Sequence, residues 1–246
     1  TPTQASVKDL QGMGIQPDII VCRSEQPLDQ GLKDKIALFC NVPNGHVLQN
    51  LDVEYLYEAP LAMEAENLAK VACESLHLDC PEPDLADWIE MVDALKHPIQ
   101  DVNIALVGKY TQLHDAYISV VEALKHGGIA ERATVNIKWV DSETLNDENA
   151  KEILGDVTGI IIPGGFGNRG VEGMISAAKY ARENKIPYLG LCLGMQLSIV
   201  EYARNVLEDT DAHSVELNPQ TTHPHIHLMP DQNGIEDIGG TLRLGA

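Results

Sequence analysis

The chain has 246 residues, of which 44% are hydrophobic and 22% charged, a composition typical of folded globular proteins and not of disordered ones. Its 37 acidic residues against 17 Lys and Arg give a net charge of −20. So acidic a surface repels phosphate backbones and anionic lipids, which argues against partners such as nucleic acid or a membrane surface. No apolar run approaches the roughly 20 residues that a membrane-spanning helix needs.

The first part of the chain predicts alternating strands and helices. Apolar runs predict strands over 18–22, 35–40 and 46–51, and amphipathic spacing predicts helices over 6–14 and 63–76. Prolines at both ends of 80–98 indicate a linker with a short helix. We therefore expect a first domain over 1–80, a linker over 81–100 and a second domain over 101–246.

A second series of strands and helices begins near residue 101. We predict strands over 102–110, 133–141 and 187–192, a strand running into a glycine-rich turn over 157–173, and helices over 116–128, 174–185 and 193–207. Gly127 and Gly128 are expected to stop the first of these helices. The fold class is therefore α/β, with two parallel-sheet units.

Cysteine usage favours a reducing, cytoplasmic setting. The chain has five cysteines, an odd number, and no Cys-x-x-Cys pair, so a disulfide framework or a zinc site is poorly supported. Cys22, Cys40, Cys73 and Cys80 lie in apolar strand-like or helical text and are predicted to be small buried side chains. Cys192 stands apart because glycines flank it.

The segment Gly190-Leu191-Cys192-Leu193-Gly194 follows an apolar strand and opens an amphipathic helix. This pattern is typical of a nucleophile elbow, a strained turn that needs small residues on both sides of the nucleophile. Such a turn exposes the thiol at the carboxyl edge of a parallel sheet, where α/β folds bind ligands. The helix N-terminus there favours negative charge. The alternative is a buried cysteine at the end of a strand.

The segment Pro163-Gly164-Gly165-Phe166-Gly167-Asn168-Arg169-Gly170 also lies between a strand and a helix. Its glycines let backbone N–H groups converge on an oxyanion, although no Gly-Lys-Ser/Thr follows, as a P-loop requires. An ordinary tight turn is the alternative. If the two segments end neighbouring strands, a thiol and an amide cradle lie together, as acyl transfer needs.

The segments PGGFG and LGLCLGMQ, one helix apart, resemble a class I (triad) glutamine amidotransferase domain. With GIQPDIIVCRS, KIALFCNV, VGKY, DAYISVVEALKHGG and GGTLRLGA, nearly the whole chain resembles the cytidine triphosphate (CTP) synthase family. The resemblance implies a ligase of pyrimidine biosynthesis that makes CTP from UTP, ATP and glutamine-derived ammonia. It implies a P-loop-like amidoligase (synthetase) unit, a flavodoxin-like glutaminase unit, Mg²⁺ with ATP, inhibition by CTP, activation by GTP and a homotetramer.

The resemblance also implies roles for residues of the glutaminase unit. Cys192 would form a glutamyl thioester, and the backbone N–H groups of Gly165 and Leu193 would stabilise the oxyanion. Glutamine would be held by Gly165, Leu193, Gly194, Met195, Gln196 and Glu216. Of these, Gln196 and Glu216 would fix its α-amino and carboxylate ends.

In the synthetase unit, the resemblance implies UTP and CTP contacts at Thr1, Pro2, Thr3, Gln4 and Lys35, and ATP contacts at Arg23, Leu51, Asp52 and Val53. Lys109 and Arg243 match basic positions that link the two activities. The family's P-loop and magnesium carboxylates lie upstream of the segment that this chain resembles, and its triad His and Glu lie downstream. We therefore expect both units to be incomplete, no metal ligand in this chain, and little activity of the chain alone.

His223, His225 and His227 alternate, which would place them on one face of a strand at a spacing that can bind zinc. A solvated strand or loop beside Pro224 is the favoured interpretation. Two other functions stay open. One is a stand-alone cysteine hydrolase of the same superfamily, and the other is a catalytically inactive nucleotide-binding or assembly module.

Overall fold

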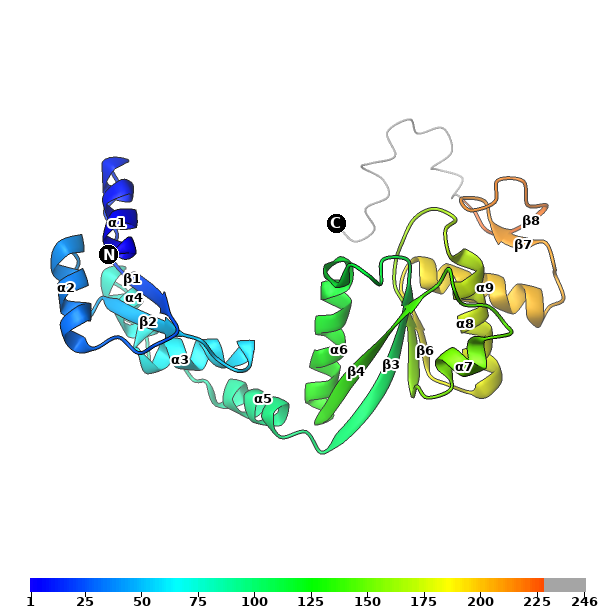
Figure 1. Ribbon diagram of the computed structural model, residues 1–246, viewed down its shortest axis with the longest axis horizontal. Coiled ribbons are helices and arrows are strands. Elements are labelled where there is room, and N and C mark those ends of the chain that lie inside the picture. The colour runs from blue at the N-terminus through cyan, green and yellow to red at the C-terminus, as the bar shows by residue number, and fades with distance from the viewer. Residues whose placement is uncertain (228–246) are drawn as a thin grey trace. The chain divides into compact units, whose positions relative to one another are not determined.

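The computed structural model describes residues 1–227 and divides the chain into two compact units between Lys96 and His97 (Figure 1). This division falls inside the segment expected to be a linker. The helix of that segment, α5 (Ala86–Lys96), is attached to the first unit. The Trp88 indole N–H donates to the carbonyl oxygen of Tyr57 (2.8 Å), and the Lys96 ammonium pairs with the Glu58 carboxylate (2.7 Å).

The first unit is a small parallel sheet with helices. Its other elements are α1 (Pro2–Gly12), β1 (Ile20–Ser24), α2 (Gln30–Cys40), β2 (Val47–Leu51), the 3-10 helix η1 (Leu56–Glu58), α3 (Ala59–Ala65) and α4 (Leu68–Ser75). Strands β1 and β2 pair in parallel, with Ser24 opposite Leu51. The core of the unit is a cluster of Val7, Ile20, Cys22, Ile36, Ala37, Cys40, Val42 and Val47.

The strand predicted over 35–40 is wrong, because these residues form the end of helix α2. Asp29 caps this helix with its carboxylate. Ile36 and Cys40 are buried one helical turn apart, whereas Leu38 and Phe39 between them are exposed. That spacing is helical. It places the side chains of Ile36 and Cys40 against the sheet, whereas those of Leu38 and Phe39 face outward.

Several helix boundaries also differ from the predictions, and two of these differences arise at identifiable residues. The helix expected over 63–76 is broken into α3 and α4 at Asn67, which has a left-handed φ of 61°. The expected stop at Gly127 and Gly128 is wrong, since α6 continues to Ala130. A glycine pair weakens a helix, but packing can carry the helix through it.

The second unit contains a four-stranded parallel sheet in the order β4-β3-β5-β6. Its elements are β3 (Gln100–Gly108), η2 (His114–Tyr117), α6 (Ile118–Ala130), β4 (Ala133–Asp141), α7 (Ala150–Leu154), β5 (Gly159–Ile162), α8 (Val171–Asn184), β6 (Tyr188–Gly190), α9 (Leu193–Asn205), β7 (Ala212–Ser214) and β8 (His223–Ile226). The predicted α/β class is confirmed. The chain order reverses between β3 and β5, which makes their carboxyl ends the topological switch point of a flavodoxin-like sheet.

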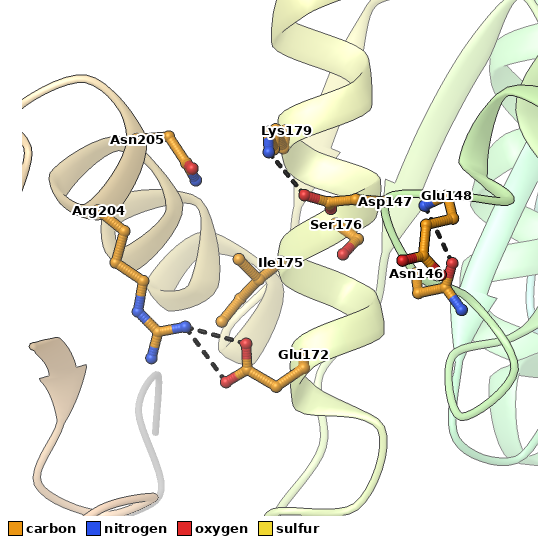
Figure 2. Close-up of a pocket in the computed structure, with 9 residues that line it drawn as sticks. All are labelled: Asn146, Asp147, Glu148, Glu172, Ile175, Ser176, Lys179, Arg204 and Asn205. Carbon is orange, nitrogen blue, oxygen red and sulfur yellow. Dashed lines mark hydrogen bonds and ion pairs between the residues drawn. The ribbon is translucent and has the colours of Figure 1, made fainter. Parts of the chain in front are cut away.

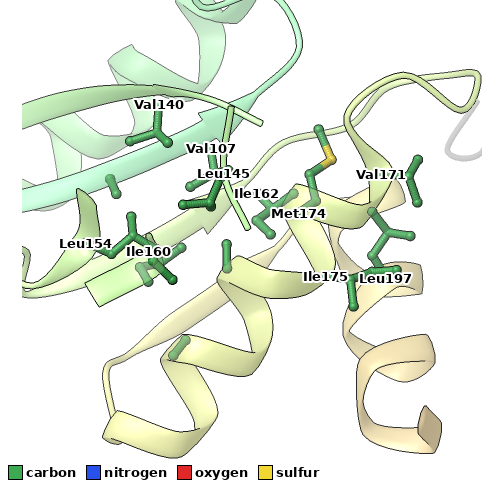
Figure 3. Close-up of a cluster of buried hydrophobic side chains, with 14 of the residues drawn as sticks. Val107, Val140, Leu145, Leu154, Ile160, Ile162, Val171, Met174, Ile175 and Leu197 are labelled. Carbon is green, nitrogen blue, oxygen red and sulfur yellow. The ribbon is translucent and has the colours of Figure 1, made fainter. Parts of the chain in front are cut away.

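Helices cover both faces of this sheet, α6 on one face and α7 to α9 on the other (Figure 1). Successive side chains of β3 point to opposite faces of the sheet, so they contribute to two separate hydrophobic layers, one under each set of helices. Ala105 and Val107 belong to the larger cluster, which includes Met174 and Leu197 from α8 and α9 (Figure 3). Leu106 points the other way, against Tyr117 and the α6 side. In the part of the chain that the structure describes, no helix is long and apolar enough to cross a membrane.

Candidate active site

Cys192 connects β6 to α9 in a backbone conformation that side chains rarely adopt. Its φ is 51° and its ψ is −103°, and its side chain is exposed. A non-glycine residue at positive φ persists only where its surroundings hold it, and such positions cluster at functional sites. The exposed thiol at the first turn of a helix therefore has the geometry of the elbow, and not that of a buried strand-end cysteine.

The glycines on both sides of Cys192 are required by close backbone packing. A Cβ atom at Gly190 would lie 2.5 Å from the backbone nitrogen of Met195, and one at Gly194 would overlap the carbonyl oxygen of Ile162. The Tyr188 hydroxyl donates to the carbonyl oxygen of Gly194 (2.7 Å), and its burial raises the pKa of Tyr188. The start of α9 is thus pressed against β5 and tied to β6.

The glycine-rich turn after β5 lies directly against this elbow. A Cβ atom at Gly164 would be 3.5 Å from that of Cys192, and one at Gly165 would be 3.5 Å from Leu193 Cδ2. Within residues 1–227, the backbone N–H of Gly165 has no hydrogen-bond partner. The N–H of Leu193 belongs to the first turn of α9, where amides lack partners in the helix. These two amides therefore belong to the two segments that pack against each other at Cys192.

Lys109, directly after β3, holds the turn from the other side. Its side chain is buried, and its ammonium donates to the carbonyl oxygens of Phe166 (2.9 Å) and Gly167. Burial lowers the pKa of Lys109, the nearby Arg169 lowers it further, and Glu216 opposes both. The Arg169 guanidinium in turn donates to the carbonyl oxygen of Lys109 (2.9 Å). These contacts join the end of β3 to the glycine-rich turn after β5, at the topological switch point of the sheet.

The structure brings most of the predicted glutaminase residues together. Met195 is half-exposed on the first turn of α9, and the backbone N–H of Gln196 donates to the carbonyl oxygen of Cys192 (3.1 Å). Glu216 is exposed after β7 and is linked to the site through its electrostatic effect on Lys109. Among residues 1–227, no histidine is hydrogen-bonded to the sulfur of Cys192.

In the first unit, the predicted ATP residues meet at the carboxyl ends of β1 and β2. The Arg23 guanidinium pairs with the Asp52 carboxylate and donates to the carbonyl oxygen of Asn50 (3.2 Å). Leu51 ends β2 directly before this pair, and Val53 follows it, half-buried. This edge of a parallel sheet is where α/β folds bind ligands.

The predicted UTP residues lie on two helices. Thr1, Pro2, Thr3 and Gln4 form the start of α1, where Thr1 and Gln4 make a reciprocal capping box. Val7 of α1 and Cys22 of β1 belong to the same buried cluster, so this helix packs against β1, and burial raises the pKa of Cys22. Lys35 is exposed on α2. No hydrogen bond or ion pair described in residues 1–227 joins it to the predicted UTP residues on α1 or to the predicted ATP residues at the ends of β1 and β2.

The histidines of β8 bind a carboxylate. Asp209 accepts from His223 Nδ1 (2.5 Å) and His225 Nε2 (2.8 Å), whereas His227 follows the end of the strand. The hydrogen bond between His223 and Asp209 raises the pKa of His223 and lowers that of Asp209. The described residues contain no group of three His, Cys, Asp or Glu side chains that could hold a metal ion.

A pocket of about 360 Å³ lies between α8, α9 and the loop before α7 (Figure 2). Its lining is Asn146, Asp147, Glu148, Glu172, Ile175, Ser176, Lys179, Arg204 and Asn205. None of the predicted site residues is among them. Lys179 is paired with Asp147 (2.6 Å) and Arg204 with Glu172 (3.0 Å), so the pocket offers a ligand no unpaired cation.

Two contacts of the site were not predicted from the sequence. The tie between Tyr188 and Gly194 has no local signal, because a tyrosine in an apolar strand gives no sign of its partner. No contact was predicted for Lys109 either, although a lysine directly after a buried strand is a detectable signal. Arg243 and the segment 239–246, which carried part of the resemblance, lie outside the described residues.

Family models match both units. The model described as Glutamine amidotransferase class-I matches residues 112–245, and the model described as CTP synthase N-terminus matches residues 1–78. Curated proteins named CTP synthase are similar along 99% of the chain. They include those of Clostridium beijerinckii (58% identity over 244 residues, 46% of the relative), Clostridium kluyveri (59%, 45% of the relative) and Halalkalibacterium halodurans (54%, 46% of the relative).

A solved structure of the glutaminase domain of Trypanosoma brucei CTPS, with bound acivicin, is also similar. Its TM-score is 0.50 at 47% sequence identity, and the match covers 53% of this chain and 51% of that one. The chain spans about half the length of the curated relatives it matches.

Proposed function

We propose, because the chain belongs to the class I glutamine amidotransferase family and along almost its whole length to the CTP synthases, that its second unit hydrolyses glutamine through Cys192. One observation carries this proposal. The Cys192 thiol is exposed in a strained elbow, with the glycine-rich turn packed directly against it. The arrangement supplies a nucleophile and amide donors in one place.

The reaction is an acyl transfer in two steps. The Cys192 sulfur attacks the side-chain carboxamide carbon of glutamine, and the carbon–nitrogen bond breaks to release ammonia and leave a glutamyl thioester. The N–H groups of Gly165 and Leu193 stabilise the oxyanion that forms in between. Water then cleaves the thioester, which gives glutamate and restores the thiol. A general base carries the thiol proton to the leaving nitrogen, and none of the histidines in residues 1–227 is hydrogen-bonded to the sulfur for this step.

Two side chains are proposed to orient glutamine. The exposed carboxylate of Glu216 attracts the α-ammonium group, and the Gln196 amide, one turn from the elbow, hydrogen-bonds the α-carboxylate. Gly194 and Met195 shape the wall between them. This placement fixes the amino-acid end of the substrate, so that only its carboxamide reaches Cys192.

For the whole protein we propose synthesis of CTP from UTP, ATP and the released ammonia, in the cytoplasm. The first unit contributes the Arg23–Asp52 pair and Leu51 to Val53 on the ATP side. Thr1 to Gln4 and Lys35 contribute to the UTP side, where CTP also binds as an inhibitor. Activation by GTP and a homotetramer belong to the same proposal. Mg²⁺ with ATP also belongs to this proposal, and no residue of this chain is proposed as its ligand.

Alkylation of Cys192 by a glutamine analogue tests the glutaminase proposal. The 246-residue chain is incubated with acivicin, the molecule bound in the trypanosome structure, and then digested with trypsin. The tryptic peptide 186–204 contains Cys192 and no other cysteine. We expect the adduct on this peptide, protection by excess glutamine, and no adduct in Cys192→Ser.

The exposed thiol of Cys80 is the control for simple thiol reactivity, because it lies in a different tryptic peptide, 71–96. Iodoacetamide should label both peptides, whereas acivicin should label only the one with Cys192. A folded sample without an adduct on Cys192, or with equal acivicin labelling of Cys80, would refute the proposal. Cys80→Ser should react with acivicin at the rate of the unchanged chain.

A further inference from the structure

Two cysteines of the first unit are brought together where α4 ends. Leu78 N–H donates to the carbonyl oxygen of Cys73 (2.9 Å), and His77 has a left-handed φ of 55°. A bond that spans five residues, with a left-handed residue inside it, is the Schellman form of a helix C-terminus. It turns the chain back on the helix, and the turned-back segment carries Cys80.

The turn brings the two thiols into each other's neighbourhood. Cys73 is half-buried, Cys80 is exposed, both are free, and Cys80 is close enough to influence the ionisation of Cys73. The sequence-based prediction that both are buried is wrong. Cys22 and Cys40, by contrast, are buried in the core of the same unit. The pair therefore combines proximity with access from solvent, which are the two requirements of thiol–disulfide exchange.

We propose that Cys73 and Cys80 are a modification site, a dithiol that closes reversibly to a disulfide with a low-molecular-weight disulfide such as oxidised glutathione. The inference is independent of the glutaminase proposal, because neither cysteine belongs to the second unit. Closing the bond ties the segment that leads toward α5 to the end of α4.

The exchange balances in two steps. The Cys80 sulfur, as thiolate, attacks oxidised glutathione, forms a mixed disulfide and displaces one glutathione thiolate, which takes up the proton that Cys80 lost. The Cys73 sulfur then attacks the Cys80 sulfur, forms the intramolecular bond and displaces the second glutathione, which receives the Cys73 proton. The two protein thiols are oxidised by two electrons, and oxidised glutathione is reduced to two thiols.

The order of the steps follows from the surroundings. The neighbouring Cys80 thiol raises the pKa of Cys73, burial raises it further, and the nearby Glu64 acts in the same direction. A raised pKa disfavours the Cys73 thiolate, and Cys73 is also half-buried whereas Cys80 is exposed. Cys80 meets the oxidant, and Cys73 resolves the mixed disulfide.

Mass spectrometry after thiol blocking tests the proposal. The reduced 246-residue chain is equilibrated with mixtures of oxidised and reduced glutathione, blocked with N-ethylmaleimide and digested with trypsin. Cys73 and Cys80 share the tryptic peptide 71–96, which contains no other cysteine. We expect this peptide to lose both maleimide adducts together and to be lighter by two hydrogens, at mixtures in which the peptides of Cys22 and Cys40 keep theirs. Dithiothreitol should restore both adducts.

Single variants separate the two roles. Cys73→Ser should accumulate a glutathione mixed disulfide on Cys80, whereas Cys80→Ser should keep Cys73 reduced under the same mixtures. Three results would overturn the proposal. They are a peptide that keeps both maleimide adducts, a mixed disulfide that persists on Cys80 in the unchanged chain, and a disulfide between two chains on a non-reducing gel.

Discussion

The Lys109 ammonium donates a hydrogen bond to the carbonyl oxygen of Phe166 over 2.9 Å, and so joins the end of β3 to the glycine-rich turn after β5. The same turn packs against Cys192 through Gly164. The amide of Gly165, proposed to stabilise the oxyanion, therefore has its position set by a buried cation directly after the neighbouring strand β3.

Replacing Lys109 by methionine should slow the alkylation of Cys192. Met keeps the apolar stem but removes the ammonium, so the turn carbonyls lose their donor and the Gly165 amide shifts. Because a misplacement of about 1 Å can cost on the order of 100-fold in rate, we expect at least about tenfold slower acivicin labelling. Lys125→Met, at an exposed lysine of α6, is the control. Equal labelling rates in the two variants would contradict the positioning role of Lys109.

Gly194→Ala should displace α9 or unfold the second unit. Its new Cβ would overlap the carbonyl oxygen of Ile162, and backbone atoms cannot move aside as a flexible side chain can. Overpacking of this kind costs about 1–3 kcal/mol or more, measured by urea unfolding. The matched control is Gly127→Ala in α6, where nothing lies within 4 Å, and it should stabilise the helix by about 0.5–1 kcal/mol. A tolerated Gly194→Ala would show that α9 need not approach β5 so closely.

Arg182→Met should destabilise the second unit, because it leaves the buried Glu201 carboxylate without its cation and with only the Asn205 side-chain amide as a donor (3.2 Å). The Arg182 guanidinium donates to both oxygens of Glu201 (2.8 and 3.1 Å), whose side chain is 3% exposed. Because the Arg182 side chain is 33% exposed and solvent screens part of the interaction, we expect a cost of about 1–3 kcal/mol. The double variant Arg182→Met with Glu201→Leu should regain most of this loss in chemical unfolding. If the single and double variants were equally unstable, the cost would come from packing and not from the uncompensated charge.

Strands β7 and β8 pair in parallel as a separate two-stranded sheet, and the contact between His223 and Asp209 should make this pairing depend on pH. Because the fold raises the pKa of His223, its contribution is fully present below the ordinary histidine value of about 6.5 and is lost as pH rises through the raised value. Asp209→Asn should lower the midpoint of the His223 titration followed by NMR. Asp156→Asn, which breaks the pair with Lys138 instead, should leave it unchanged. An unshifted midpoint in Asp209→Asn would refute this coupling.

Much of the second unit could be predicted because its signals are local. The strand over 133–141 is observed with the predicted bounds, since nine residues of alternating and β-branched text leave little choice. The apolar run 35–40 was ambiguous, because a short run fits either a buried strand or one face of a helix. The Asp29 cap and the burial of Ile36 and Cys40 by packing decide for the helix.

The elbow around Cys192, the glycine-rich turn and the family could all be recognised from local sequence, because backbone sterics and glycine spacing act within a few residues. Which groups meet at the elbow depends on contacts between distant parts of the chain. Lys109 reaches the Phe166 carbonyl across 57 residues of chain, and Asp209 reaches His225 across 16. Parallel strand pairing aligns the carboxyl ends of β3, β5 and β6 at one edge of the sheet. A polar group buried at that edge loses its hydrogen bonds to water, so it must form hydrogen bonds with protein groups that the fold brings close to it.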